Sequence, residues 1–590
     1  FAQQVIRADA SADGNADGMS WEDAYTDLQD ALAIAAEGDE IWVAAGTYKP
    51  DRETGERTLS FDIPSGIALY GGFAGWEMQR FQRNWNKNGT ILSGDLSGDD
   101  GPRDCEQHSD CCYEHEDVGC DDAICADTVC SVRPDCCVPG VPGFTWDDIC
   151  AAAARDECCH LGSWNTCENS FYVVTMDVKE TPTILDGFTI RSAYASVRDG
   201  LNIFPFGILD QSRGSQISNC LFTNNYRGAG STGGVFTKNT FRDSVMAGLL
   251  GTDVTVTDCR FVDNVGGIAM SGISSLTRCT FEGQTLVAVT STGDVTIDRC
   301  SFLDNPGDGY HATSGTARVR DCVFSRTGLN AIVAFTTTMI LERIAFLGNL
   351  QAPLVVIRTA VRAEDCLFSG NRANGGIVGI IAGFAEFDHC TFHGNRAFGI
   401  LLRAISLTSS GASATIRNSI IWGADGDPSG TEDALLKDAD TSNLSIDYSI
   451  VQGWTGKLGG VGNSGDVPLF VDTIGPDGIV GTADDDLHLS PESPAIDAGG
   501  PSSAFPLSRD LDGHPRVLCG QVDIGAYEFG LGDYDCDRAI DLYDFQSWPG
   551  CMTGPEGGPY LFGCESFDAN ADSSVDLSDF AYLQRAFSGP

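Results

Sequence analysis

The sequence predicts an all-β solenoid of short parallel strands, with a helical segment near its N-terminus, a disulfide-rich insertion and two acidic loops near its C-terminus. Three observations predict this organisation. A six-residue pattern recurs about ten times, the 590 residues include 70 glycines but only 20% charged residues, and the 23 cysteines fall into separate populations. Such a composition favours many tight turns around small buried side chains rather than helices.

The repeat takes over near residue 185 and carries an apolar residue, then a cysteine, then a phenylalanine. Its copies are Ile217–Phe222, Val256–Phe261, Leu276–Phe281, Ile297–Phe302, Val319–Phe324, Leu341–Phe346, Ala363–Phe368 and Phe387–Phe392, with weaker copies at Ile416–Ile421 and Ile446–Val451. From Cys259 to Cys390, equivalent positions lie 20 to 24 residues apart. A period of this length, without a helical segment, indicates one solenoid turn per repeat.

Alternation inside each copy places the first apolar residue, the cysteine and the phenylalanine on one face. Stacked turns about 4.8 Å apart would then carry columns of like residues along an interior wall. Asparagines follow the phenylalanine by two or three places, and we expect them in left-handed corners between strands. These residues are Asn224, Asn264, Asn305, Asn349, Asn371 and Asn395.

The N-terminal 100 residues predict a lid for one end of the strand stack. Residues 20–37 have helical spacing of apolar side chains, with Ser20 as the N-cap and Asp23 in the capping-box position. Apolar strands are expected at Ile41–Ala45, Leu59–Ile63, Ile67–Phe73 and Thr90–Ser93. A lid is needed because an open end exposes unpaired strand edges.

The first cysteine population forms a column with one residue per turn: Cys220, Cys259, Cys279, Cys300, Cys322, Cys366 and Cys390. A metal or redox column is one interpretation, and a stack of small buried thiols is the other. Thr240, Ile344, Ser419 and Ser449 occupy the same position in other turns. Because a ligand column would not alternate with isoleucine, we expect thiols.

The second population is dense: Cys105, Cys111, Cys112, Cys120, Cys125, Cys130, Cys136, Cys137, Cys150, Cys158, Cys159 and Cys167. Twelve cysteines within 63 residues predict a disulfide-stapled insertion, with a short helix from Trp146. Zinc is the competing interpretation, because His108, His115 and His160 lie inside.

Two acidic loops near the C-terminus predict calcium sites. The first supplies ligand positions 1, 3, 5, 7, 9 and 12 from Asp533, Asp535, Asp537, Ala539, Asp541 and Asp544. The second, 35 residues later, supplies them from Asp568, Asn570, Asp572, Ser574, Asp576 and Asp579. Calcium requires six to eight such oxygens, including a backbone carbonyl at position 7. Arg538 and Ser573 stand where a glycine usually makes the sharp turn, and each loop runs into a helix-like stretch, 542–547 or 577–587.

Further acidic groups are weaker signals. Residues 472–486 resemble a calcium-stabilised turn, with a solvated acidic surface as the alternative. Asp95, Asp99 and Asp100 form a shorter group, to which we assign no site.

Several phrases resemble known families. The repeats resemble the pectate-lyase-type right-handed parallel β-helix and its polymorphic-outer-membrane-protein-like relatives. Ser493–Gly499, Asp510–Arg516 and Val522–Glu528 are similar to the choice-of-anchor Q domain of secreted bacterial proteins. The paired acidic loops resemble a dockerin domain, and the insertion resembles those of planctomycete-type secreted proteins. These resemblances imply a cap and first turns over 1–100, the insertion over 101–167, further turns over 168–470, a choice-of-anchor-Q-like end over 471–530, and a dockerin-like calcium domain over 531–590.

Charge and hydropathy bound the environment and the partners. Lys and Arg total 36 against 83 Asp and Glu, giving a net charge of -47. This charge argues against nucleic acid and anionic lipid as partners, and no apolar run is long enough to span a membrane. Residues 1–4 resemble the region around a signal-peptide cleavage site, so we expect a secreted, extracellular protein.

The function predicted first is a structural or interaction protein. A calcium-stabilised β-helical rod would assemble into an extracellular filament or surface layer, or adhere to another extracellular protein. The alternative is a polysaccharide lyase, glycoside hydrolase or glycan-binding protein. Asp258, Asp304, Asp321, Asp365 and Asp388 recur at one outward position, with Arg278 and Arg299 between them, as on a solvated solenoid face. His311 with Asp308, and His389 with His393, remain the best acid-base candidates, and we assign no catalytic residue.

Overall fold

The structure is a computed structural model. It describes residues 3–98, 169–176, 181–194, 205–374, 376–397, 403–407, 412–423, 432, 443–501, 509–554, 559–561 and 563–586. The cysteine-rich insertion predicted between Cys105 and Cys167, with its alternative zinc ligands, lies outside these residues, as do Asp99 and Asp100. The chain divides into two compact units, Phe1–Ile268 and Ala269–Pro590, and each is described by itself.

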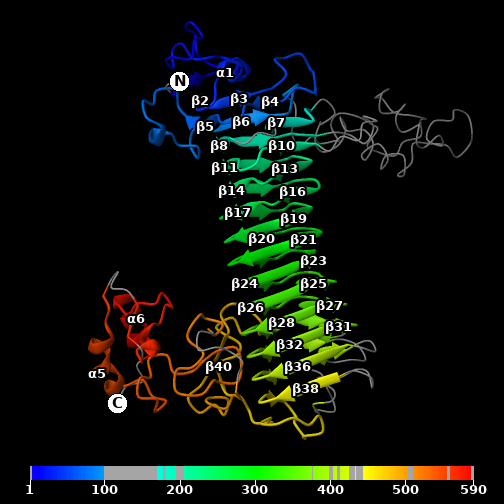
Figure 1. Cartoon of the computed structure of the whole chain (residues 1–590), viewed down its shortest axis with the longest axis vertical. Coiled ribbons are helices and arrows are strands. Elements are labelled where there is room, and N and C mark those ends of the chain that lie inside the picture. Colours follow the sequence, from blue (N-terminus) through cyan, green and yellow to red (C-terminus); the bar gives the residue numbers. More distant parts are fainter. Residues whose placement is uncertain are drawn as a thin grey trace, which may run out of the picture. The chain divides into compact units, whose positions relative to one another are not determined.

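The first unit begins with a short helix and six strands (Figure 1). The elements are β1 (Val5–Ala8), α1 (Leu28–Ile34), β2 (Glu40–Ala44), β3 (Gly46–Tyr48), β4 (Phe61–Ile63), β5 (Ala68–Phe73), the 3-10 helix η1 (Arg80–Gln82) and β6 (Thr90–Ser93). The four predicted strands are confirmed to within one or two residues. α1 buries Leu28, Ala31 and Leu32.

The predicted helix start at Ser20 was wrong. α1 begins after Asp27, whose carboxylate accepts a hydrogen bond from the backbone N–H of Gln29. The preceding residues are held by β1 instead, because Tyr25 exchanges backbone hydrogen bonds with Arg7 and Asp9. The capping contact between Ser20 and Asp23 forms, but it closes only a turn.

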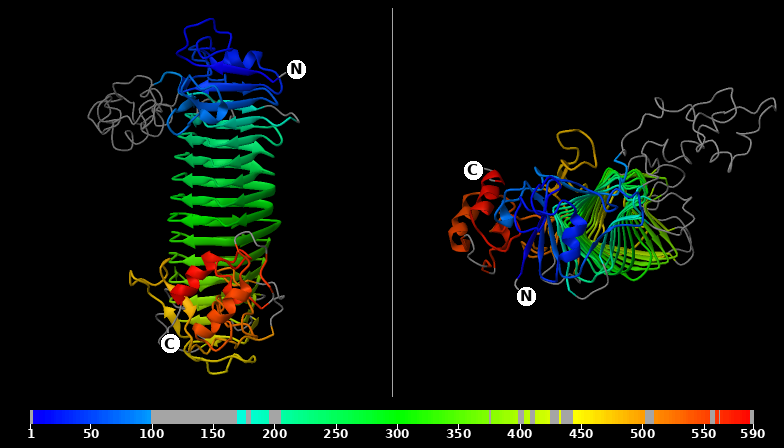
Figure 2. Two further views of the ribbon diagram at one scale, coloured as in Figure 1. Left: turned by 90° about the vertical axis from the view of Figure 1, so that its left-hand side faces the viewer. Right: turned by 90° about the horizontal axis from the view of Figure 1, so that it is seen from above.

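Three parallel strands per turn build the rest of the first unit. These are β7 (Tyr172–Met176), β8 (Ile184–Asp186), β9 (Thr189–Arg191), β10 (Phe206–Asp210), β11 (Gln216–Ser218), β12 (Leu221–Thr223), β13 (Arg227–Thr232), β14 (Val235–Thr237), β15 (Thr240–Arg242), β16 (Ala247–Thr252), β17 (Thr255–Thr257) and β18 (Arg260–Val262). Each pairs in parallel with the strand three places along, as β10 does with β13 and β12 does with β15. The strands therefore lie one above another (Figure 2).

The second unit contains the same kind of turn, with adjacent strands often merged. Its strands are β20 (Thr280–Glu282), β21 (Val287–Asp298), β22 (Ser301–Leu303), β23 (Asp308–Ala312), β24 (Thr316–Ser325), β25 (Ile332–Phe335), β26 (Thr338–Leu347), β27 (Leu354–Ile357), β28 (Ala360–Glu364), β29 (Leu367–Ser369), β30 (Arg372–Ala373), β31 (Gly376–Ile381), β32 (Phe384–Asp388), β33 (Thr391–His393), β34 (Arg396–Ala397), β35 (Arg403–Leu407), β36 (Ser413–Arg417), β37 (Ile420–Trp422), β38 (Asn443–Asp447) and β39 (Ile450–Val451). The chain passes from the first unit to the second within β19 (Gly266–Thr277).

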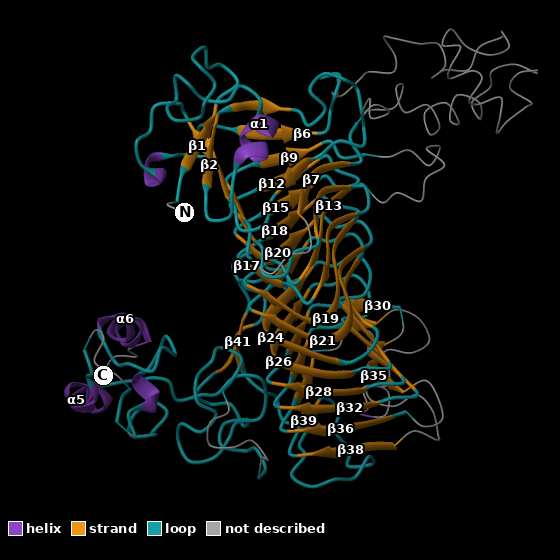
Figure 3. Ribbon diagram, turned by 45° about the horizontal axis from the view of Figure 1, so that its top comes forward, coloured by secondary structure: helices purple, strands orange, loops and turns teal. Residues whose placement is uncertain are grey.

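An antiparallel pair and two helices follow the solenoid of the second unit (Figure 3). These elements are β40 (Phe470–Asp472), β41 (Asp486–Leu489), α5 (Leu542–Cys551), the 3-10 helix η6 (Glu565–Phe567) and α6 (Leu577–Ala586).

Phenylalanine and cysteine columns fill the interior, as the repeat predicts. Phe302 stacks on Phe324 with ring centroids 4.2 Å apart, and Phe368 stacks on Phe392 at 4.4 Å. The seven cysteines of the column are buried and are thiols rather than disulfides. The Cys300 thiol donates to the carbonyl of Asp298, two residues earlier. The expectation of buried thiols is therefore confirmed.

The asparagines predicted for left-handed corners form a buried ladder instead. Only Asn224 has a positive φ, at 54°. In the other five turns the residue before the asparagine takes that conformation, as Gly370 does at 62°. The freed asparagine turns inward: Asn371 accepts from the side chain of Asn349 at 2.8 Å and donates to the Phe346 carbonyl at 2.9 Å. Burial requires every amide group to find such a partner.

Candidate metal centre in the terminal module

Residues 470–501 and 509–530, named the clasp, cover the outer surface of turns in the second unit. The residue between the cysteine and the phenylalanine of each repeat points outward, and Arg260 and Ser301 are accessible there. In later turns the same position holds Leu367 and Ile420, which are buried. Ile420 packs in one cluster with clasp residues Leu489, Ala495, Ile496 and Ile524.

A fully buried arginine joins the clasp to the solenoid. Both Nε and Nη2 of Arg516 donate to Oδ1 of Asp365, at 2.8 and 2.7 Å. Nη2 also donates to the Gly525 carbonyl at 2.7 Å, and Nη1 lies 3.4 Å from Oε2 of Glu528. The prediction of a solvated acidic row was therefore wrong at Asp365, and also at buried Asp388, which accepts from the Asn418 side chain.

Burial dominates the electrostatics of this cluster. It raises the pKa of Asp365 to about 7, although the Arg516 guanidinium opposes the shift. Burial likewise raises the pKa of Asp523 to about 7, against hydrogen bonds from the backbone N–H groups of Asp497 and Phe529. The pKa of Glu528 rises well above its usual range for the same reason. One guanidinium thus faces several carboxyl groups, and some of these hold protons near neutral pH.

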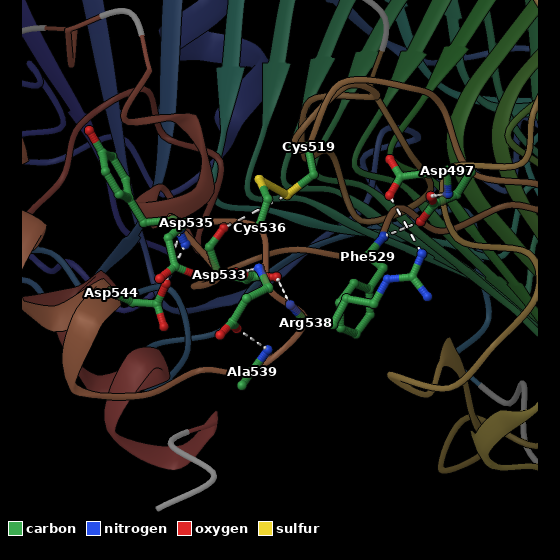
Figure 4. Close-up of a disulfide and its surroundings, with 12 residues drawn as sticks. Asp497, Cys519, Phe529, Asp533, Asp535, Cys536, Arg538, Ala539 and Asp544 are labelled. Carbon is green, nitrogen blue, oxygen red and sulfur yellow. Dashed lines mark hydrogen bonds and ion pairs between the residues drawn. A yellow bond between two sulfur atoms is a disulfide. The ribbon is translucent and has the colours of Figure 1, made fainter. Parts of the chain in front are cut away.

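Residues 531–554, 559–561 and 563–586, named the terminal module, are stapled by two disulfides that the sequence did not single out. Cys519–Cys536 links the clasp to the module (Figure 4). Cys551–Cys564 links the end of α5 to the segment before η6. Trp548, Phe567, Val575 and Leu583 form a core around the second disulfide. These four cysteines belong to neither population, and their pairing of α5 with a distant segment has no signature in spacing.

The first acidic loop, Asp533–Asp544, brings three predicted ligands together. Carboxylate oxygens of Asp533, Asp535 and Asp537 lie within 4.8 Å of one another. Asp533 is buried and accepts from the backbone N–H groups of Asp537 and Arg538, at 3.1 and 2.8 Å (Figure 4). Asp544, also buried, accepts from the N–H groups of Tyr534, Asp535 and Asp541 and so folds the loop onto α5.

The second loop, Asp568–Asp579, repeats this network bond for bond. Asp568 at position 1 accepts from the N–H groups of positions 5 and 6, and Asp579 at position 12 accepts from positions 2, 3 and 9. Asp541 and Asp576 at position 9 each accept from the N–H two residues on, at 2.7 Å. Asn570 differs from its counterpart Asp535 by donating to Asp572 at 3.0 Å.

Position 6 adopts the turn that glycine usually makes, without glycine. Arg538 and Ser573 have φ values of 72° and 71°. A left-handed conformation is strained for such residues, and it persists only where surrounding contacts impose it. The N–H groups of both residues donate to the carboxylate at position 1, which supplies that contact.

The position-7 residues, Ala539 and Ser574, donate their N–H groups to the carboxylates at position 5. Their carbonyls remain the predicted ligands. Burial raises the pKa of Asp533 and of Asp568, and the neighbouring carboxylates Asp544 and Asp579 add to the shifts. A bound cation would reverse this penalty.

Other sequence candidates have structural roles. In the turn over residues 472–486, Asp485 accepts from the N–H groups of Gly481 and Thr482, so backbone amides use its carboxylate. His389 and His393 are buried, and burial lowers the pKa of both, for His393 to about 4. His311 lies 3.1 Å from Asp308 and is half-buried.

A cleft of about 820 Å³ lies between the clasp and the terminal module and is lined by His488, Asp512, Asn570, Tyr582 and Arg585, among others. His488 bridges two carboxylates, with Nδ1 2.7 Å from Asp486 and Nε2 2.8 Å from Asp512. Burial lowers its pKa, but these two hydrogen bonds prevail and raise it to about 10. His488 is therefore a cation that joins β41 to the rest of the clasp.

Comparisons with known proteins fix the handedness of the solenoid. Residues 266–421 match a family model described as the right handed beta helix region. The solenoid is a right-handed parallel β-helix. The described helices include none long and apolar enough to cross a membrane.

Solved β-helical structures resemble the chain at low identity. The pectate lyase Pel9A is 12% identical, with 90% of this chain and 97% of that chain covered and a TM-score of 0.28. The catalytic unit of a GH87 alpha-1,3-glucanase from Streptomyces thermodiastaticus is 13% identical, with 74% and 65% covered and a TM-score of 0.34. A tailspike protein of the E. coli bacteriophage HK620, in complex with a pentasaccharide, is 9% identical, with 74% of each chain covered and a TM-score of 0.30. No curated protein matches the sequence.

Proposed function

We propose that this chain is an extracellular interaction protein in which a β-helix carries a dockerin-like, calcium-binding terminal module. The observation that carries the proposal is the duplicated hydrogen-bond network of the two acidic loops, which lie 35 residues apart in sequence. Both loops orient a buried carboxylate at position 1 and another at position 12. Repetition of a strained turn without glycine indicates a backbone selected for its oxygen ligands rather than for solvation.

In the first loop, Asp533, Asp535 and Asp537 would supply side-chain oxygens, and Ala539 its carbonyl. Asp568, Asn570, Asp572 and Ser574 would do so in the second loop. Asp544 and Asp579 would hold each loop closed through backbone N–H groups and offer further oxygens at the site. A bound calcium ion would neutralise carboxylates that otherwise repel one another.

Disulfides support the extracellular setting. Cys519–Cys536 and Cys551–Cys564 staple a module with a small core. Such bonds persist in oxidising compartments and are rare in the cytosol. The thiols of the β-helix column are compatible with that setting because they are buried.

The test is calorimetric titration of the full-length protein with calcium, after treatment with a chelator. We expect saturable binding, and we expect calcium to slow proteolysis within residues 531–586 but not within the β-helix, whose stability is local to its turns. Asp533→Asn combined with Asp568→Asn should abolish the calcium effect. Asp466→Asn, at an exposed acidic residue outside both loops, is the matched control.

Absence of a calcium-dependent signal in the wild-type protein, with the disulfides intact, would remove the proposal. A signal that survives D533N/D568N would place calcium elsewhere and would equally contradict it.

A further inference from the structure

Two exposed apolar faces remain after the fold and the loops are accounted for. The cap face, in the first unit, consists of Trp76, Met78 and Phe81, whose side chains are 63%, 79% and 84% exposed. The tail face, in the terminal module, consists of Leu542, Tyr543 and Leu577, which are 59%, 69% and 72% exposed. Contiguous exposed side chains of this size usually mark interaction sites.

The cap face is held rigidly by buried polar groups. The carboxylate of Glu77, which is 1% exposed, accepts from the N–H groups of Ala74 and Trp76 at 2.7 and 3.1 Å. Trp21 donates to the Glu77 carbonyl at 2.8 Å. The Gln82 side chain accepts from the N–H of Met78 at 2.9 Å. A segment fixed from below in this way presents its apolar side chains without the ordering cost of a mobile loop.

The tail face belongs to both acidic loops. Leu542 and Leu577 each occupy position 10, directly after the predicted ligand at position 9, and each begins a helix. The duplicated network therefore places equivalent leucines at the start of α5 and α6. Calcium that orders the loops would also fix these side chains.

Charge distinguishes the two faces. Residues 74–87 contain Arg80, Arg83 and Lys87 and one acidic residue, Glu77, which is buried. Residues 531–590 contain 11 acidic residues and two basic ones. A cap facing a cap, or a tail facing a tail, would oppose like charges, whereas a cap facing a tail opposes unlike charges.

We propose that the cap face of one copy docks on the tail face of a second copy, so that chains join head to tail. The proposal rests on the proposed function, because it names the partner of the calcium-ordered module. Trp and Phe bury about 150–250 Å² each, so Trp76 and Phe81 alone would supply roughly half of the 800 Å² that each side of a specific interface needs. Contact between unlike faces is not self-closing and repeats along a chain of copies.

The test uses two complementary variants in calcium, followed by sedimentation velocity. M78D/F81D blocks the cap face and leaves the tail face intact, and L542K/L577K does the reverse. All four side chains are exposed, so neither variant should lose its fold, which circular dichroism checks. We expect wild-type protein to form concentration-dependent oligomers, each variant alone to be monomeric, and an equimolar mixture to form dimers and nothing larger.

Leu286→Asp, at a 61% exposed leucine outside both faces, is the control and should assemble like wild type. Self-association of L542K/L577K alone would indicate cap-to-cap contact and overturn the inference. Self-association of M78D/F81D alone would indicate tail-to-tail contact and overturn it as well. Calcium titration of the same samples separates the two proposals: a monomeric wild type that binds calcium ends only this inference, whereas one that binds none ends both.

Discussion

Replacement of Arg516 by methionine tests whether the clasp is held by its buried charge. The guanidinium of Arg516 makes two hydrogen bonds to Asp365 and one to the Gly525 carbonyl, and it lies beside Glu528. Methionine has a similar unbranched shape, so the variant removes the charge and its donors while leaving much of the packing. Asp365 is then buried without a counter-charge.

Loss of one partner of a buried ion pair costs about 3–5 kcal/mol. Asp365 can relieve part of that cost by taking up a proton, and its pKa of about 7 will rise further once Arg516 is absent. Below pH 7 this carboxyl is then protonated with or without Arg516. We therefore expect the destabilisation to grow as the pH rises above 7.

Hydrogen–deuterium exchange is the appropriate assay, because the clasp can open while the β-helix persists. Residues 510–528 should exchange faster by about two to three orders of magnitude, which corresponds to 3–5 kcal/mol. Residues 297–346 serve as the internal reference. Arg326→Met breaks an ion pair to Asp304 that is about half exposed on both sides and should lose at most about 1 kcal/mol.

A second variant separates charge from packing. Asp365→Asn in the Arg516→Met background removes the uncompensated carboxylate, and it should recover part of the lost protection. Unchanged exchange of residues 510–528 in R516M above pH 7 would refute the reasoning, because the clasp would then be held by apolar contacts alone.

Three further predictions concern the solenoid and its pH dependence. Asn371→Ala should lower the unfolding free energy of the second unit by about 1–3 kcal/mol, because the N–H of Asn349 and the carbonyl of Phe346 lose buried partners; chemical denaturation measures this. Cys300→Ala should cost less than about 3 kcal/mol, and mass spectrometry should find no Cys279–Cys300 disulfide. Asp523 has a folded pKa of about 7, above its unfolded value, so the stability that its proton contributes is present below about pH 4 and is lost as the pH rises to 7; chelated protein should show this loss at the clasp by hydrogen exchange.

The solenoid was predictable because its signal is local and repeated. Each turn restates the same apolar residue, cysteine and phenylalanine, and parallel stacking converts repetition into columns. The asparagine positions were found but misassigned, because Asn and Gly both tolerate a positive φ and the sequence does not say which of two neighbours turns. The corner fell to Gly370 and its equivalents, which left Asn371 free to form the ladder.

The clasp was not predicted because its contacts are distant in sequence. Arg516 and Asp365 are 151 residues apart, and no spacing rule connects them. One signal was present: the outward position of the repeat changes from Arg260 and Ser301 to Leu367 and Ile420. An apolar outward side chain has to be covered. The acidic loops, in contrast, were readable from ligand spacing alone, although their buried hydrogen-bond network was not.

The long reach of Arg516 has a consequence for the order of folding. Most contacts of the β-helix join neighbouring turns, as between Asn349 and Asn371, 22 residues apart. Because loop-closure entropy rises with chain length, the turns form before the clasp closes. During synthesis the turns at Leu367 and Ile420 emerge earlier than Arg516. Until the clasp arrives, their apolar outward column is open to other nascent chains, so the speed of its closure sets the yield of folded protein.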